Sequence, residues 1–300
     1  MSPGKDPSAP RVTVILATYN WATVLPYSIG SVLGQTFTDY ELLVIGDCCS
    51  DESEQVVGSF SDRRVRWINL PAKTQHQVGP NNEGLRQARG MIVAYIGHDD
   101  LWLPRHLELL VAALDRGSTF AHGRVLHVVP DERPRVIPGR GWSYRRGARI
   151  PPTSLGHRRD AGRAIGGWRL PAETGSLDPE SDLCARLFDT HGHPASIPLV
   201  TSVKLPASRR PDVYRERPHH EQEHWQSQIR DTNAPEQTFL DTYNPRPLYP
   251  TRIIWTLGKA AVKLRQRILV SIGRAPSKAE QQHVAVARYQ RNRKLKGLDD

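Results

Sequence analysis

Short apolar runs alternate with segments of helical spacing through the first 115 residues of this 300-residue chain. Continuous apolar runs of this length are typical of strands buried on both faces of a parallel sheet. Strands that alternate with helices predict an α/β fold with a mostly parallel sheet flanked by helices. The expected strands are residues 12–17 (VTVILA), 41–45 (ELLVI), 65–70 (VRWINL) and 91–96 (MIVAYI), and the expected helices are residues 22–33, 82–89 and 104–114, with another beginning near Ser50 as its N-cap.

Polar side chains directly follow three of these predicted strands. Tyr19 and Asn20 follow the first, Asp47 follows the second, and Asp99 and Asp100 follow the fourth. Ligands of open α/β sheets bind at the carboxyl ends of the strands, so we expect these side chains on one rim.

Each of these side chains allows two interpretations. The adjacent acids, Asp99 and Asp100, fit a divalent cation that bridges a diphosphate, or they stabilise the N-terminus of the following helix. Asp47 fits a hydrogen bond to a base N–H, or an Asx turn. Tyr19 fits stacking on a base, or a half-buried aromatic position.

Six segments together resemble the family 2 glycosyltransferases, which have the GT-A fold. The resemblance covers about residues 11–205, and its motifs are specific in combination. The matching segments are residues 12–20 (VTVILATYN), 28–37 (SIGSVLGQTF), 40–47 (YELLVIGD), 82–90 (NEGLRQARG), 95–107 (YIGHDDLWLPRHL) and 165–168 (IGGW).

This resemblance implies an organisation for the whole chain. We expect a disordered N-terminus over residues 1–10 and a GT-A domain over residues 11–205. Within that domain, residues 11–115 form the half that binds the nucleotide-sugar and residues 116–205 form the half that binds the acceptor. Residues 206–300 are expected to form a Pro/Arg-rich and largely helical extension.

The resemblance also implies a reaction, which is inverting transfer of a sugar from a nucleotide-diphospho-sugar, with UDP as the expected nucleotide, to an acceptor hydroxyl. Asp99 and Asp100 are the implied ligands of Mn²⁺ or Mg²⁺. Residues 179–186 (PESDLCAR) match a family segment, E-D-x-D-L-x-x-R, that supplies the general base; aligned on Arg186, it gives Glu180 as the base and Asp182 as the second candidate. The implied nucleotide-sugar-binding residues are Ala17, Thr18, Tyr19, Asn20, Asp47, Asn82, His98 and Asp99.

Three positions depart from the family pattern. Gly46 and Gly97 stand where the family often has aspartate, and Asn81 stands where it often has arginine. Loss of an acid at residue 97 removes an expected ribose contact. These departures keep open a second interpretation, a catalytically silent nucleotide-sugar-binding protein.

A different motif points to zinc. His220-Glu221-Gln222-Glu223-His224 matches H-E-x-x-H, in which two histidines share one helix face and the glutamate is a general base. The flanking residues are polar and rich in proline, and a third ligand is not evident. A solvated charged helix is therefore favoured over a zinc metalloprotease.

The formal net charge of +10 favours anionic partners without choosing among them. No nucleic-acid-binding motif accompanies the arginines, so nucleic acid is disfavoured. The acceptor is open among glycan, lipid-linked, peptide and small-molecule classes, as expected for polysaccharide or glycoconjugate biosynthesis. A basic amphipathic helix expected over residues 252–272 fits a homodimer contact, packing on the catalytic domain or peripheral contact with a membrane.

Cysteine usage and hydropathy bear on the cellular location. Two of the three cysteines are adjacent, which suits neither a disulfide framework nor a zinc site. The first ten residues lack the apolar segment of a signal peptide, and no apolar stretch reaches the roughly 18 residues of a membrane span. We therefore expect a cytoplasmic location, with peripheral attachment to the inner face of the membrane as the alternative.

Overall fold

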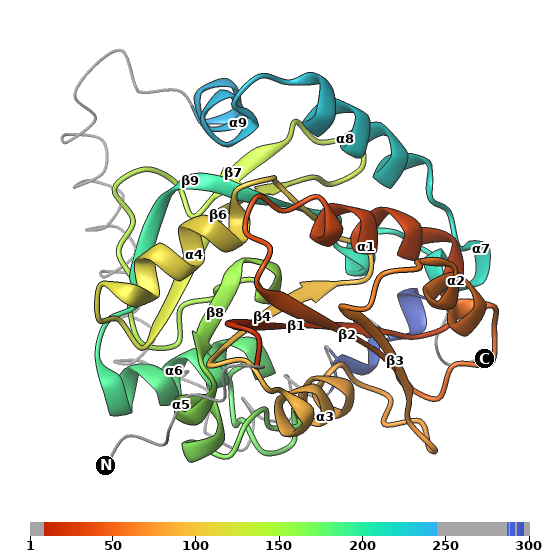
Figure 1. Cartoon of the computed structure of the whole chain (residues 1–300), viewed down its shortest axis with the longest axis horizontal. Helices are drawn as coiled ribbons and strands as arrows, with labels where there is room; N and C mark the ends of the chain where they lie inside the picture. Colours follow the sequence, from red (N-terminus) through yellow and green to blue (C-terminus); the bar gives the residue numbers. More distant parts are fainter. Residues whose placement is uncertain (1–8, 245–286, 288, 292, 297–300) are drawn as a thin grey trace, which may run out of the picture.

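The computed structural model describes residues 9–244, 287, 289–291 and 293–296. Within them lies a mixed sheet with the strand order β3-β2-β1-β4-β8-β6-β9-β5, and β7 pairs with β6 (Figure 1). The strands are β1 (Val12–Thr18), β2 (Tyr40–Gly46), β3 (Val65–Asn69), β4 (Ile92–Gly97), β5 (Leu101–Trp102), β6 (Phe120–His127), β7 (Arg135–Ile137), β8 (Leu155–Arg158) and β9 (Ala195–Lys204). The helices are α1 (Leu25–Leu33), α2 (Ser53–Ser59), α3 (Val78–Gln87), α4 (His106–Asp115), α5 (Arg159–Ala164), α6 (Pro179–His191), α7 (Val213–Glu216), α8 (His220–Asp231) and α9 (Pro235–Tyr243).

The parallel half of the sheet matches the sequence prediction. β1 pairs in parallel with β2 on one side and β4 on the other, and β3 extends the sheet beside β2. The other half is mixed, because β8 is antiparallel to both β4 and β6, while β9 is parallel to β6. The predicted α/β architecture is thus present, with an antiparallel strand in the middle of the sheet.

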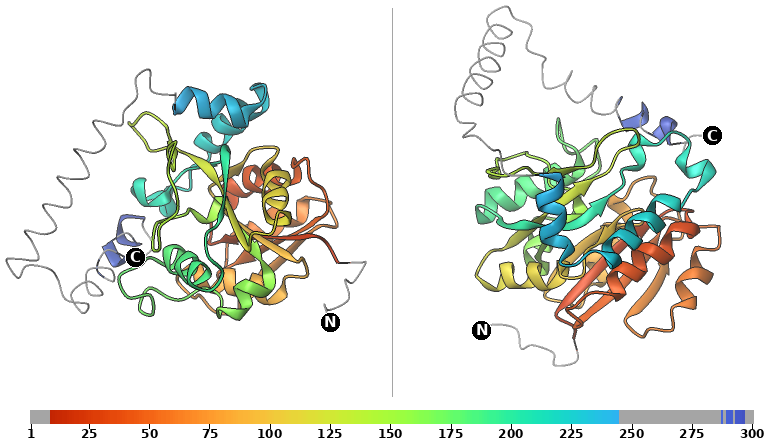
Figure 2. Two further views of the ribbon diagram at one scale, coloured as in Figure 1. Left: turned by 90° about the vertical axis from the view of Figure 1, so that its left-hand side faces the viewer. Right: turned by 90° about the horizontal axis from the view of Figure 1, so that it is seen from above.

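Helices cover both faces of the sheet (Figures 1 and 2). Alternate residues of β1 point to opposite faces, as the two-residue period of a strand requires. Val14 lies in the cluster formed with α1 and α4, whereas Ile15 lies in the cluster formed with α3, α5 and α6. Burial on both faces explains why these strands read as continuous apolar runs.

The described part of the C-terminal extension packs on the same sheet. Trp225 and Ile229 of α8, with Phe239 and Leu240 of α9, share one hydrophobic cluster with β5, β6 and β9. The predicted boundary between residues 205 and 206 therefore lies inside a continuous core, and residues 206–244 are partly helical as expected.

Some predictions fall on other parts of the chain. The helix expected over residues 252–272 and most of the expected disordered N-terminus lie outside the described residues. Among the helices that the structure describes, none has the length and apolar character needed to cross a bilayer.

Candidate active site

The polar residues singled out in the sequence come together at the carboxyl ends of the parallel strands. Asp47 follows β2 directly, and His98, Asp99 and Asp100 follow β4. Since β1 lies between β2 and β4, its own carboxyl end at Thr18 occupies the middle of this edge. We call this edge, with Lys204 at the end of β9, the strand-end rim.

Asp100 is held by the protein on both of its oxygens. Its side chain is fully buried, Lys204 Nζ lies 2.9 Å from Oδ2, and the backbone N–H of Leu205 donates to Oδ1 at 3.1 Å. Burial raises the pKa of Asp100 above its usual value, and the Lys204 ammonium opposes that shift. The prediction that Asp100 ligates a metal is not tested by this geometry, which shows that the carboxylate already orients Lys204 and the chain after β9.

Asp99 differs from its neighbour. It is buried, and Gln222 Nε2 donates to its backbone carbonyl at 3.2 Å. Among the described residues, its carboxylate makes no hydrogen bond or ion pair within the usual distances. A buried carboxylate without a partner is costly, so this group is suited to a cationic ligand.

The acids of the rim offer a divalent metal only part of its ligands. Within the described parts of the chain, no three His, Cys, Asp or Glu side chains form a complete metal cage. Mg²⁺ and Mn²⁺ do not need one, because they bind through one or two carboxylates with the remaining positions taken by water and phosphate oxygens. Asp99 therefore fits a metal that is shared with a diphosphate.

The two glycines that depart from the family pattern have close neighbours. A Cβ on Gly46 would lie 2.6 Å from Asn69 Oδ1 and 2.7 Å from the Trp67 ring. A Cβ on Gly97 would lie 2.8 Å from Asp100 Oδ2 and 3.0 Å from Asp99 Oδ1. A side chain at residue 97 would thus have to displace carboxylate oxygens of the acid pair, which glycine avoids.

The loop after β3 covers the two residues predicted to bind the base. Asp47 accepts hydrogen bonds from the backbone N–H of Thr74 at 2.6 Å and of Gln75 at 2.9 Å. Lys73 Nζ donates to the Tyr19 hydroxyl at 2.8 Å and lies 4.1 Å from the centroid of the Tyr19 ring. A base that contacted Asp47 and Tyr19 would have to replace these interactions.

His98 is enclosed by two aromatic side chains at the strand-end rim. Its Nδ1 is 3.0 Å from Thr18 Oγ1, its Nε2 is 3.1 Å from the Tyr214 hydroxyl, and Trp21 meets its ring edge-on. Burial lowers the pKa of His98 to about 3, so the ring is neutral at physiological pH. Thr18 and His98 therefore connect the ends of β1 and β4 to α7.

The side-chain amides of two predicted nucleotide-sugar-binding residues, Asn20 and Asn82, make hydrogen bonds within the protein. Asn20 has a left-handed backbone (φ 42°) and accepts from the Ser50 N–H at 2.8 Å, which joins the turns after β1 and β2. Asn82 exchanges two hydrogen bonds with the backbone of Trp168, at 2.8 and 3.0 Å. Ala17 lies in β1 and is partly buried. The nucleotide-binding roles of these residues stay predictions.

The two candidate bases lie at the start of α6 in different surroundings. Glu180 is buried and accepts from Arg149 Nη2 at 2.8 Å. Burial opposes ionisation of Glu180, but Arg149 and the α6 N-terminus outweigh it, so its pKa is lowered. His76 also interacts electrostatically with Glu180, and burial lowers the pKa of His76 to about 4.

Asp182 is instead part of a structural clamp. Its Oδ2 accepts from Arg186 Nε at 2.8 Å. The same guanidinium donates to the carbonyls of Ile165 at 2.6 Å and Gly167 at 2.7 Å, so it holds the turn before Trp168. Asp182 is thereby bound to the arginine that holds this turn, and the choice between the two acids as general base stays a prediction.

The H-E-x-x-H segment forms the first turns of α8, and its side chains are used differently from those of a zinc site. Glu221 is ion-paired with Arg210, at 2.7 Å between Oε1 and Nη2, and His220 and His224 are exposed. Gln222 is the buried member and contacts Asp99. The zinc interpretation gains no support from the described residues.

Several residues of the site could not be inferred from the sequence. Lys204, Arg149 and Tyr214 contact the predicted residues from segments about 30 to 116 positions away along the chain. Lys204 ends β9, and nothing in its sequence neighbourhood distinguishes it from a surface lysine. The packing of the sheet, rather than any spacing, assigns these residues to the site.

Comparison with known proteins assigns the family. The model described as Glycosyl transferase family 2 matches residues 13–165. The Escherichia coli UDP-Glc:alpha-D-GlcNAc-diphosphoundecaprenol beta-1,3-glucosyltransferase WfgD is 34% identical over 114 residues, which cover 37% of this chain and 44% of that protein. The Campylobacter jejuni GalNAc(5)-diNAcBac-PP-undecaprenol beta-1,3-glucosyltransferase is 31% identical over 119 residues, or 39% of this chain and 38% of that protein.

The chain therefore belongs to glycosyl transferase family 2, and the aligned part spans less than half the length of these two relatives. The predicted family is confirmed, and the enzyme class of that family is glycosyltransferase.

Solved structures confirm the predicted GT-A type of fold. Staphylococcus aureus TarS 1–349 in complex with UDP-GlcNAc has a TM-score of 0.57 at 14% identity, covering 78% of this chain and 73% of that chain. The Pyrobaculum calidifontis mannosyltransferase PcManGT in complex with GDP-Man and Mn²⁺ has a TM-score of 0.52 at 22% identity, covering 99% and 86%.

Proposed function

We propose that this protein transfers a sugar, with inversion, from a UDP-linked donor to an acceptor hydroxyl. The observation that carries the proposal is Asp99 at the strand-end rim, a buried carboxylate that makes no hydrogen bond or ion pair with the described residues. Its position after β4 is where ligands of such sheets bind. The family and the nucleotide-sugar complexes of TarS and PcManGT support a donor of this class.

A divalent cation, Mn²⁺ or Mg²⁺, fits beside Asp99, and it would supply Lewis-acid stabilisation of the departing diphosphate. Asp99 is the proposed ligand among the protein groups. Asp100, the neighbour of Asp99 in sequence, is ion-paired with Lys204 and orients it. In our proposal Asp100 is therefore a positioning residue. The complex of PcManGT with GDP-Man and Mn²⁺ is the comparison that supports a metal.

Glu180 is the proposed general base. A base must be ionised before it accepts the acceptor proton, and the lowered pKa of Glu180 keeps it ionised at neutral pH. Arg149 fixes its orientation. Asp182 remains the second candidate, although its bond to Arg186 commits it to the turn at residues 165–167.

A lipid-linked acceptor is the favoured acceptor class. The names of the Escherichia coli and Campylobacter jejuni relatives both specify undecaprenol-linked acceptors. A protein acting on such an acceptor would work at the cytoplasmic face of the membrane, so peripheral attachment is part of the proposal. The basic composition of the chain suits an anionic lipid surface.

Calorimetric titration with UDP and GDP, with and without Mn²⁺, tests the donor site. UDP should bind in a metal-dependent way, and Asp99→Asn should lose most of this binding while keeping its fold. Absence of binding by both nucleotides, or equal binding by Asp99→Asn, would refute the proposal. Binding without turnover of any UDP-sugar would identify the chain as a silent nucleotide-sugar-binding protein.

A further inference from the structure

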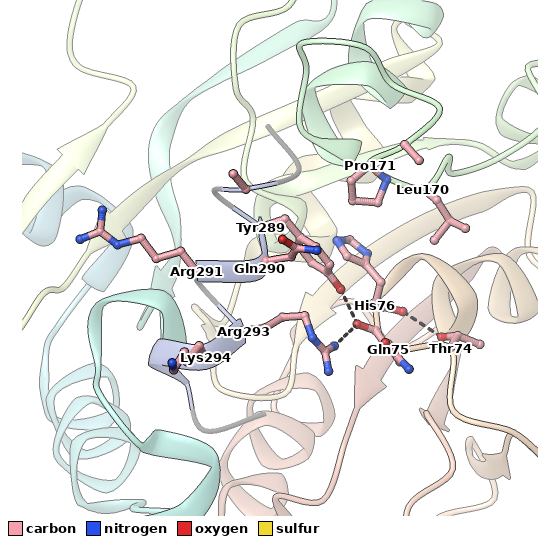
Figure 3. A pocket seen from close by; sticks show the side chains of 12 residues that line it. Thr74, Gln75, His76, Leu170, Pro171, Tyr289, Gln290, Arg291, Arg293 and Lys294 are labelled. Carbon is pink, nitrogen blue, oxygen red and sulfur yellow. Dashed lines mark hydrogen bonds between the residues drawn. The ribbon is translucent and has the colours of Figure 1, made fainter. Parts of the chain in front are cut away.

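The described C-terminal residues 287, 289–291 and 293–296, here called the C-terminal segment, return to the strand-end rim. Tyr289 donates from its hydroxyl to the carbonyl of Gln75 at 2.5 Å, and Arg293 Nη1 donates to the same oxygen at 2.7 Å (Figure 3). The Tyr289 ring also lies 5.1 Å from the ring of His76. The segment therefore contacts the loop that covers Asp47.

A second set of contacts fixes the other end of the C-terminal segment. The backbone N–H of Tyr214 donates to the carbonyl of Lys296 at 3.1 Å, and that of Asp212 donates to Leu295 at 3.0 Å. Tyr214 is the residue that binds His98 beside Asp99. The position of Lys296 is thus set by the same structure that sets the rim.

Lys296 has no ion pair with a carboxylate in the part of the chain that the structure describes. Lys204 is paired with Asp100 and Arg149 with Glu180. Lys296 interacts electrostatically with Asp99 and Glu180, yet no carboxylate among the described residues lies within ion-pair distance of its ammonium. Burial lowers its pKa, Asp99 and Glu180 oppose that shift, and Lys204 and Arg149 add to it. A half-buried ammonium without an ion pair among the described residues favours binding of an anionic group.

The structure also leaves space beside the loop that covers Asp47. A cavity of about 770 Å³ lies between the C-terminal segment, the loop at Thr74–His76 and residues 170–172 (Figure 3). This volume falls in the range of small-molecule sites, roughly 300–1,000 Å³. The C-terminal segment therefore forms one wall of a cavity.

We propose that Lys296 binds the diphosphate of the donor, so that the C-terminal segment completes a donor site built by the first half of the chain. This inference rests on the proposed function and adds a residue to it. Asp99 and Lys296 then act on the same group with opposite charge, Asp99 through the metal and Lys296 directly on phosphate oxygens.

The test compares ligands with and without the diphosphate. UDP and uridine, and in parallel GDP and guanosine, are titrated in the presence of Mn²⁺ against the full-length wild type, Lys296→Gln and Lys296→Arg. Arg116→Gln is the charge-matched control, because it also removes one cation. Arg116 is exposed at the C-terminal end of α4, about 15 Å along the helix from its first turn. The nucleosides report that the base site is folded in each variant.

Lys296→Gln should weaken binding of the nucleoside diphosphate about tenfold or more and leave nucleoside binding unchanged, because one charge-assisted contact is lost. Lys296→Arg should keep most of the affinity, and Arg116→Gln should match the wild type. Unchanged or tighter diphosphate binding by Lys296→Gln would overturn the inference. Lys296 would then have no effect on donor affinity or would oppose donor binding. If the wild type binds neither diphosphate, the proposed function fails as well; if it binds one in an Asp99-dependent way, only the role of Lys296 is in question.

Discussion

Replacement of Asp100 by asparagine should destabilise the fold more than it affects the donor site. The Asp100 side chain is 1% exposed and that of Lys204 is 18% exposed, so the pair is effectively buried. Asparagine offers one acceptor oxygen where Lys204 and the Leu205 N–H now have one each. Removing one partner of a buried ion pair costs about 3–5 kcal/mol. For a domain of this size, that corresponds to a decrease in Tm of about 6–20 °C.

Chemical denaturation and thermal unfolding of Asp100→Asn measure this effect directly. The control is Glu108→Gln, whose pair with Arg105 has both side chains more than 40% exposed and should contribute at most about 1 kcal/mol. Adding Lys204→Met to Asp100→Asn should recover part of the lost stability, since no unpaired charge is then buried. A loss of stability below about 1 kcal/mol, together with loss of UDP binding, would refute this reasoning and return Asp100 to the role of metal ligand.

Three further predictions concern the turn at residues 166–168, the base and a buried histidine. Gly167→Ala should cost more stability than Gly166→Ala in urea unfolding. Both glycines have left-handed backbones, which cost an alanine about 1–2 kcal/mol, but only at Gly167 would a Cβ clash with Asn82 Oδ1, at 2.5 Å. Equal losses of stability would contradict this clash. Glu180→Gln should reduce kcat by about 10²–10⁴-fold with donor affinity retained; near-normal kcat would transfer the role of base to another group. Burial lowers the pKa of His157 to about 4, so its contribution to stability is complete above pH 6.5 and is lost as the pH falls, by about 1.4 kcal/mol per pH unit between roughly pH 6.5 and 4. In His157→Gln the free energy of unfolding should therefore depend less steeply on pH. An unchanged slope would exclude His157 as a source of this pH dependence.

The parallel half of the fold could be predicted because local sequence determines it. The runs at residues 12–17 and 41–45 are apolar except for Thr13 and Glu41, and the structure buries both strands on each face. Helix ends were less accurate: α3 begins at Val78, four residues before the expected start. The prediction of Ser50 as an N-cap was wrong, because α2 begins at Ser53 and Asp51 accepts the Ser53 N–H at 3.2 Å.

The mixed half escaped prediction because its strands do not look like strands. β6 (FAHGRVLH) buries a histidine and carries a glycine, and β9 (ASIPLVTSVK) contains a proline. Each is stabilised by neighbours that come from distant parts of the chain: β6 lies between β8 and β9. Tertiary context, rather than β-propensity, decides such segments.

The candidate site shows the same division. Asp47 and Asp99 could be placed on one rim because each follows a strand of a parallel sheet. The sequence could not reveal that Asp47 is covered by Thr74 and Gln75, or that Asp99 and Asp100 have different partners. Hydrogen-bond partners depend on side-chain packing. The adjacency of Asp99 and Asp100 in the sequence carries no information about that packing.

The hydrophobic cluster shared by α8, α9 and the sheet has a consequence for how the chain can be divided. A recombinant fragment ending at residue 205 would uncover Leu101, Val203 and Leu205, which now pack in the cluster that contains Trp225 and Phe239. Each buried side chain of this kind contributes about 1.5–3 kcal/mol. Such a fragment should aggregate or melt at low temperature, whereas residues 11–244 should unfold in a single cooperative transition.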